Sequence, residues 1–181
     1  TLAIETATGK VKALMEGAKQ WLGFVPNMYA AMANEPALYQ AYASGYAAFR
    51  SECGFTPIEQ EVIFLVISRE NGCNYCMAAH SFIADTMSNV PLEVTEAIRD
   101  GKAIADRQLQ ALAAFTAKMV SSRGRVSDAD SAAFKSFGYS EKNILGIILA
   151  ISMKTLSNYT HFLFDLPLDT EFSGRAWTAR S

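Results

Sequence analysis

The chain has 181 residues, of which 50% are hydrophobic and 19% charged, so it is long and apolar enough to bury a core and is not disordered. Its net charge of −2 offers no basic surface, which argues against nucleic acid or an anionic membrane as a partner. The longest apolar run, 144–152, contains a glycine and is much shorter than the roughly 20 residues of a membrane span. We expect a single domain over residues 1–181.

The N-terminal residues and the number of cysteines predict the cellular compartment of the protein. Residues 1–10 do not combine a basic start with an apolar core, which is the pattern of a secretory signal. Three cysteines without such a signal predict a reducing, cytoplasmic location, where paired cysteines are more often catalytic or metal-binding than structural.

Apolar residues recur at three- and four-residue spacing through most of the chain, which predicts an all-α fold of about seven or eight helices. Thr56, Pro57 and Glu59 form the sequence pattern of a capping box with a proline at the first helical position. The expected helices, in chain order, cover residues 11–22, 36–49, 56–71, a segment starting near 73, 91–101, 105–121, 127–137 and 140–164. Residues 23–27 are expected to form a turn, and 166–181 an extended C-terminal segment.

One internal similarity links two parts of the chain. When Thr56 is aligned with Ser140, the pair Asn74-Tyr75 falls on Asn158-Tyr159, and hydroxyl residues replace the two cysteines that flank the first pair. The match is explained either by chance between two apolar helices or by a duplicated helix pair. A duplicated pair would pack around a pseudo-twofold axis, with thiol chemistry in the first copy alone.

The residues that indicate chemistry are two cysteines and a histidine in the helix after Gly72. Cys73 and Cys76 are one helical turn apart, with α-carbons about 5 Å from each other, a separation that a disulfide can close. At about 100° per residue, His80 shares their face. Gly72 would end the preceding helix and place both thiols in the first turn of the next, where the helix dipole stabilises a thiolate. A thiolate is the nucleophile of redox chemistry, and a neighbouring thiol traps a sulfenic acid as a disulfide.

Glu61 lies in an otherwise apolar part of the preceding helix. The chain must fold back at the Asn71-Gly72 turn, so this carboxylate could reach the cysteines. The alternative is an exposed acid in the first turn of its own helix, favoured there by the helix dipole. The spacing leaves both interpretations open.

Glu61, Cys73, Cys76 and His80 together resemble the motif of the AhpD-like branch of the carboxymuconolactone decarboxylase family. The resemblance is specific over residues 56–85 and looser over 36–121. The run Asn-Gly-Cys-Asn-Tyr-Cys-Met-Ala-Ala-His and the later Leu-Pro-Leu-Asp at 166–169 are similar to the subgroup of peroxidase-related proteins. The resemblance implies an AhpD-like helical bundle, a homotrimer or homohexamer, and thiol-dependent reduction of hydroperoxides by an external dithiol or protein reductant. It implies no cofactor and no metal.

The family also suggests a role for each residue. Cys76 would attack the peroxide, Cys73 would resolve the product, and Glu61 and His80 would form a proton relay. The best-characterised members of the family carry a histidine before the second cysteine, whereas this chain has Tyr75, a phenol that donates a hydrogen bond but is not a base at neutral pH. The resemblance therefore implies a shorter relay, with peroxidase activity that is weak or directed at another substrate. The decarboxylase branch lacks the cysteine pair, which argues against muconolactone decarboxylation.

Three alternatives use the same residues differently. The cysteine pair could act in disulfide exchange or as a redox sensor without peroxide turnover. Cys73, Cys76 and His80 could bind zinc with a fourth ligand from Cys53, Glu61 or His161, although the chain has no second Cys-x-x-Cys pair. The cysteines could also be buried small residues of a purely structural helical protein.

Two further groups are expected to be structural. His161 corresponds to Met77 in the internal similarity and is expected to support the packing around it. The aromatic residues between positions 24 and 49 are more typical of a core or an interface than of a substrate pocket, although some of them could form a wall of the site. These residues are Phe24, Tyr29, Tyr39, Tyr42, Tyr46 and Phe49.

Overall fold

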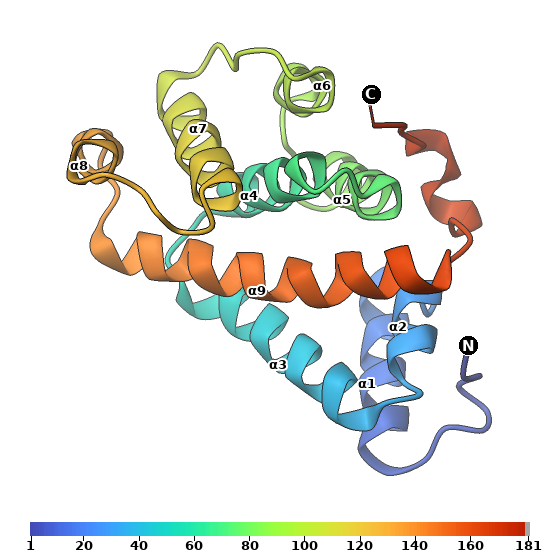
Figure 1. Ribbon diagram of the computed structural model, residues 1–181. Coiled ribbons are helices and arrows are strands. Elements are labelled where there is room, and N and C mark those ends of the chain that lie inside the picture. Colours follow the sequence, from blue (N-terminus) through green and yellow to red (C-terminus); the bar gives the residue numbers. More distant parts are fainter. Residues whose placement is uncertain (180–181) are drawn as a thin grey trace.

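The computed structural model describes residues 1–179, and this part of the chain is all α, as the spacing of the apolar residues predicts (Figure 1). In order, its helices are α1 (Gly9–Leu22), α2 (Asn27–Met32), α3 (Pro36–Glu52), α4 (Pro57–Glu70), α5 (Asn74–Thr86), α6 (Leu92–Asp100), α7 (Arg107–Ser121), α8 (Asp128–Ser136), α9 (Glu141–Phe164) and the 3-10 helix η1 (Thr170–Arg175). None of these helices is long and apolar enough to cross a membrane.

Helix α4 is the centre of the packing. All its residues from Gln60 to Ser68 are buried, and the helix contacts α5, α6, α7 and α9. The long helix α9 runs between two groups of helices: α4 to α7 on one side and α1 to α3 on the other (Figure 1). A helix that is apolar all round needs neighbours on every side, and this arrangement supplies them.

The predicted capping box and turn set the positions of α4 and α5. The carboxylate of Glu59 accepts a hydrogen bond from the Thr56 N–H at 2.8 Å, and the Thr56 hydroxyl accepts one from the Glu59 N–H at 3.3 Å. At the other end of α4, Gly72 has a left-handed φ of 67°. The N–H groups of Gly72 and Cys73 donate to the carbonyls of Arg69 and Ser68, which is the hydrogen-bond pattern of a Schellman motif. This turn makes Cys73 the N-cap residue of α5.

Two parts of the predicted helix map are wrong. The described chain has nine α-helices rather than seven or eight, because the short helix α2 follows the turn after α1. The tail is not fully extended: residues 170–175 form η1, whose Phe172 is buried against Tyr75 and Phe82. The tail forms a helix here because this conformation buries the aromatic ring against α5. Residues 180 and 181 of the predicted tail lie outside the described residues.

Of the two explanations of the internal similarity, the structure contradicts the duplicated helix pair. The first segment of the internal similarity is broken into α4 and α5 by the left-handed Gly72, whereas the second lies within the single continuous helix α9. Leu156 occupies the position that corresponds to Gly72, so the second segment has no glycine to make the turn.

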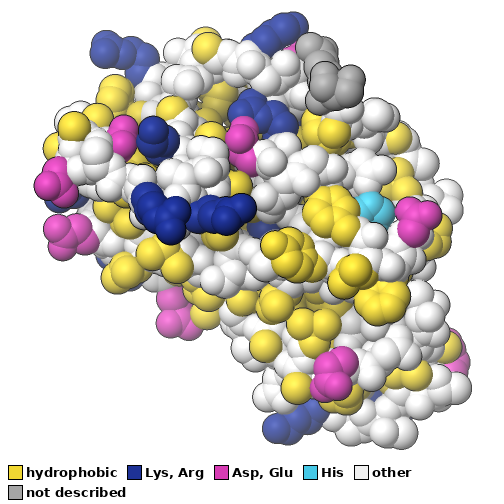
Figure 2. Space-filling view, in the orientation of Figure 1, with side chains coloured by type: hydrophobic (Ala, Val, Ile, Leu, Met, Phe, Trp, Pro, Cys, Tyr) yellow, Lys and Arg dark blue, Asp and Glu magenta, His cyan; other side chains and the backbone are white. Residues whose placement is uncertain are grey.

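Helix α9 also carries hydrophobic side chains on the surface (Figure 2). Near its C-terminal end, Tyr159, Phe162, Leu163 and Phe164 are exposed, and Leu145 and Ile148 are exposed nearer its start. Apolar side chains that gather on one surface helix are typical of an interaction site.

Candidate active site

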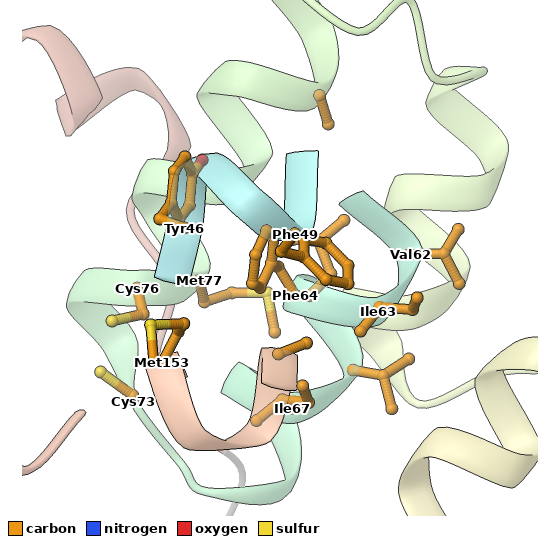
Figure 3. Close-up of a cluster of buried hydrophobic side chains, with 14 of the residues drawn as sticks. Tyr46, Phe49, Val62, Ile63, Phe64, Ile67, Cys73, Cys76, Met77 and Met153 are labelled. Carbon is orange, nitrogen blue, oxygen red and sulfur yellow. The ribbon is translucent and has the colours of Figure 1, made fainter. Parts of the chain in front are cut away.

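The two cysteines of the motif lie in the first turn of α5, as predicted, and both are free thiols. Cys73 has no exposed surface and Cys76 is 3% exposed. Figure 3 shows the two side chains next to each other, at the edge of the hydrophobic cluster that contains Met77 and Met153. The first turn of a helix favours negative charge, so the position suits a thiolate.

The surroundings give the two thiols different pKa values. Burial raises the pKa of Cys76, but the hydrogen bond with Cys73 and the positive charge of Lys154 outweigh it and bring this pKa well below its ordinary value. The hydrogen bond with Cys76, together with burial, raises the pKa of Cys73. These two shifts make Cys76 the more acidic thiol of the pair.

Lys154 is the charged neighbour of Cys76, and the motif does not point to it. It lies on α9, is 1% exposed, and lines the same small cavity as Cys76 and His80. Its Nζ atom is 5.8 Å from the centroid of the Phe64 ring. One signal was present in the sequence: Lys154 is the only Lys, Arg, Asp or Glu between residues 144 and 164.

Glu61 is fully buried and reaches the site, so the interpretation of an exposed first-turn acid is wrong. It contacts His80 rather than the cysteines: its Oε2 lies 2.9 Å from His80 Nδ1. A carboxylate accepts hydrogen bonds, so Nδ1 carries the proton and Nε2 of the neutral ring is an acceptor. The other oxygen, Oε1, is 2.5 Å from Arg50 Nη2 and accepts a longer hydrogen bond of 3.5 Å from Ser88.

The charges around Glu61 and His80 fix their protonation. Burial raises the pKa of Glu61, but the charge of Arg50 and the hydrogen bond of His80 outweigh it and hold this pKa below its ordinary value. Burial, with the nearby charge of Lys154, lowers the pKa of His80 to about 4. At neutral pH the site therefore contains an ionised carboxylate and a neutral imidazole that can accept a proton.

Arg50 holds the carboxylate from the side opposite to His80. Its guanidinium donates a hydrogen bond to the Tyr46 hydroxyl and lies over two rings, 4.8 Å from the centroid of Tyr46 and 5.1 Å from that of Phe64. The sequence gives no signal for this role, because a basic residue in the last turn of a helix is expected there for the helix dipole alone.

The hydroxyl of Tyr75 forms its hydrogen bonds away from Glu61 and His80. Its hydroxyl donates to the Asp169 carboxylate and accepts from the backbone N–H of Met28 at 3.2 Å. Asp169 in turn accepts from the backbone N–H of Asn27 at 3.0 Å. Burial and the Asp169 carboxylate raise the pKa of Tyr75, so the phenol stays protonated. Tyr75 ties α5 to α2 and to the C-terminal segment, while its ring lines the cavity beside Cys76.

Polar side chains of α9 cover the first turn of α5. Ser157 Oγ lies 3.7 Å from Cys76 Sγ, and Asn158 Oδ1 accepts from Asn71 Nδ2 at 2.7 Å. His161 Nε2 lies 2.6 Å from Asn74 Oδ1, which agrees with the structural role expected for it. These α9 residues belong to the second segment of the internal similarity and pack directly on the first.

The space at Cys76 is small. A cavity of about 30 Å³ borders Cys76, His80 and Lys154, which is room for about one water molecule. Within residues 1–179, no three His, Cys, Asp or Glu side chains are grouped so that they could hold a metal ion. His80, one ligand of the zinc alternative, points its Nδ1 at Glu61 instead.

Comparisons with known proteins find a family match and several structures of similar fold. Residues 36–117 match the carboxymuconolactone decarboxylase family, and this segment contains Glu61, Cys73, Cys76 and His80. No curated protein matches the chain.

Solved structures share the fold over almost the whole chain. An uncharacterized peroxidase-related protein from Ralstonia eutropha JMP134, described as an alkylhydroperoxidase AhpD core, has a TM-score of 0.85 and 23% identity, over 97% of this chain and 95% of that one. A peroxidase-related protein from Silicibacter sp. TM1040 has a TM-score of 0.81 and 23% identity, over 96% and 93% of the two chains. The debrominase Bmp8, in complex with 2,3,4-tribromopyrrole, has a TM-score of 0.77 and 18% identity, over 92% and 89%. The chain therefore has the fold of AhpD-core peroxidase-related proteins, and its residues 36–117 match the carboxymuconolactone decarboxylase family.

Proposed function

We propose that the chain is a thiol-dependent peroxidase that reduces organic hydroperoxides through Cys76 and Cys73. The observation that carries the proposal is the asymmetry of the thiol pair. Cys76 lines the small cavity together with His80 and the buried Lys154, whereas Cys73 has no exposed surface. This setting lowers the pKa of Cys76 and raises that of Cys73. A peroxidase that uses two cysteines needs this division, because one sulfur must attack and the other must wait.

The reaction has two steps. The Cys76 thiolate attacks the terminal oxygen of the hydroperoxide, the O–O bond breaks, and the alkoxide takes a proton and leaves as an alcohol. The Cys73 thiol then attacks the sulfur of the Cys76 sulfenic acid, a disulfide forms, and water leaves. Together, two thiols and one hydroperoxide give one disulfide, one alcohol and one water. An external dithiol then reduces the disulfide.

His80 is proposed to move the proton. Its Nε2 accepts the proton of the Cys76 thiol after each reduction and passes it to solvent, and later passes a solvent proton to the leaving alkoxide. Glu61 orients the ring through Nδ1, and Arg50 fixes Glu61 in turn. Lys154 compensates the negative charge on the sulfur.

Burial of the two sulfurs supports a small oxidant over a protein disulfide. Exchange with another protein requires an accessible sulfur, whereas Cys73 has no exposed surface and Cys76 is 3% exposed. The same burial favours a small dithiol over a protein as the reductant. We also propose a homotrimer or homohexamer, which the exposed apolar side chains of α9 support.

The test of the function is the mass of the reduced protein before and after one equivalent of an organic hydroperoxide, without added reductant. The expected result is a rapid loss of two hydrogens, assigned by peptide mapping to a Cys73–Cys76 disulfide. In Cys73→Ser the reaction should stop at a sulfenic acid on Cys76, and Cys53→Ser, the matched control, should behave like the unmodified chain. A Cys76→Ser variant that keeps full turnover would contradict the assignment.

A further inference from the structure

A second and larger space lies next to the cavity at Cys76, between α1 and α3. This cleft has a volume of about 480 Å³, which is in the range of small-molecule sites. Small residues on the two helices make room for it: Gly17 and Ala18 on α1, and Ala43 and Ala47 on α3. Its other walls are largely aromatic, with Trp21, Tyr29, Tyr39, Tyr42 and Tyr46.

Three tyrosines separate the cleft from Cys76. Tyr29, Tyr42 and Tyr46 each line both the cleft and the small cavity. The ring centroids of Tyr29 and Tyr42 are 5.6 Å apart, and those of Tyr42 and Tyr46 are 5.8 Å apart, so the three rings lie side by side at the boundary of the two spaces. The cavity on the sulfur side holds about one water molecule, so the carbon body of an organic peroxide does not fit there. The cleft is the adjoining space in which such a body can lie.

The cleft and the proposed relay also share residues at the inner end. Arg50 and Ser88 line the cleft, and both contact Oε1 of Glu61. Arg50 is the one charged side chain in the lining, and the Glu61 carboxylate balances it. A carboxylate or phosphate ligand would therefore find no uncompensated positive charge. The lining instead suits a neutral molecule with an apolar, ring-sized body.

We infer that this cleft binds the body of a neutral aromatic hydroperoxide, whose –OOH group passes the three tyrosines to reach Cys76. The inference rests on the proposed peroxidase function and names its substrate class: bulky aromatic hydroperoxides rather than hydrogen peroxide. The chemistry is that of the two steps above. The alcohol that leaves Cys76 keeps its ring in the cleft until it dissociates.

Gly17 allows a test that does not touch the thiols or the relay. Gly17 lines the cleft, and a Cβ atom built on it meets no atom within 4 Å, so the position has room for a larger residue. Gly17→Leu is the test variant, and Gly17→Ala is the matched control. We expect Gly17→Leu to lower kcat/KM for cumene hydroperoxide about tenfold, which is about 1.4 kcal/mol of binding. For hydrogen peroxide, which needs only the small cavity, kcat/KM should stay unchanged. An equal loss with both peroxides, or no loss with either, would overturn the inference.

Binding can be measured without any turnover. The chain has two tryptophans, and Trp21 lines the cleft, so Trp177→Phe leaves Trp21 as the only tryptophan reporter. The probe is 2-phenyl-2-propanol, the alcohol that cumene hydroperoxide yields. We expect a saturable fluorescence change that Gly17→Ala keeps and Gly17→Leu loses. No saturable change would overturn the cleft as a binding site. Binding of the alcohol without oxidation of Cys76 by either peroxide would support the site and contradict the peroxidase function, so the two failures are distinguishable.

Discussion

His80 Nδ1 lies 2.9 Å from Oε2 of Glu61, a carboxylate with no exposed surface. Removing a carboxylate from water costs several kcal/mol, and here Arg50 and the imidazole compensate for it. Glu61 therefore matters for stability and for the proposed chemistry. Its carboxylate orients the proposed base, His80, and is also a buried charge that Arg50 and His80 must compensate.

Glu61→Gln should lower both stability and rate. The amide keeps the shape of the carboxylate but leaves the charge of Arg50 without its partner, so we expect a loss of about 2–4 kcal/mol in the free energy of unfolding. Oxidation of Cys76 should slow by about 10²-fold, because the imidazole loses the group that orients it. Urea unfolding and stopped-flow kinetics measure the two effects. Glu52→Gln, at an exposed position of α3, is the control, and equal behaviour of the two variants would contradict the relay.

Lys154→Met should raise the pKa of Cys76. The variant removes the buried positive charge that stabilises the thiolate and keeps an unbranched side chain of similar length. The pH profile of Cys76 alkylation by iodoacetamide, followed by peptide mapping in a Cys53→Ser background, should move to higher pH, and the oxidation rate at pH 7 should fall. Lys142→Met removes a charge at an exposed position of the same helix and should leave the profile in place. An unchanged profile in Lys154→Met would show that the thiolate does not depend on this lysine.

Stability should fall as the pH drops below about 6.5. The pKa of His80 is about 4 in the folded chain, against an ordinary value of 6.5, so the unfolded chain binds more protons between these values. Stability due to the neutral imidazole is complete above pH 6.5 and is lost as the pH falls toward 4. The expected loss between pH 7 and pH 5 is about 2 kcal/mol in urea unfolding. His80→Gln should show a smaller loss over the same interval, and an equal loss would assign the effect to other groups.

Tyr75→Phe should affect stability and leave the chemistry intact. The hydroxyl links the Asp169 carboxylate to the backbone of Met28, so its removal leaves a buried carboxylate with one partner fewer. We expect a loss of about 1–3 kcal/mol in the free energy of unfolding. The rate of Cys76 oxidation should stay within about twofold of the unmodified chain, since the phenol is bound to Asp169. A tenfold loss in the rate of Cys76 oxidation with normal stability would indicate that Tyr75 takes part in the relay.

The proposed oligomer predicts a defined mass in solution. Light scattering after size-exclusion chromatography should give three or six chains. Leu163, which is 78% exposed on α9, should lie in a contact between chains, so Leu163→Glu should reduce the mass toward that of one chain. Lys12→Glu introduces the same new residue, a glutamate, at an exposed position of α1 and should not alter the mass. A monomeric unmodified chain would contradict the proposal.

The parts of the fold that the sequence predicted are those with local causes. Thr56 and Glu59 satisfy each other across a single helical turn, and Gly72 supplies a backbone conformation that other residues rarely adopt. Both signals act over a few residues, so the ends of α4 and the start of α5 follow from them. The shared face of Cys73, Cys76 and His80 follows from helical geometry in the same way.

The features that were not predicted depend on contacts between distant segments. Lys154 reaches Cys76 because α9 packs across α5, and no local pattern encodes that crossing. The tail forms the helix η1 because the ring of Phe172 packs against α5. The internal similarity did not lead to a duplicated helix pair for a related reason. Shared isoleucines indicate that two segments are buried. A single glycine decides whether such a segment is one helix or two.

Lys154 lies outside the segment of the chain that matches the family. The four motif residues lie inside the segment 36–117, whereas the cation at Cys76 comes from α9, outside that segment. Two chains can therefore share the whole motif and still differ in how acidic the attacking thiol is. A search that reads only the motif would group them together. The residue that α9 places next to the second cysteine is therefore one to compare between chains that share the motif.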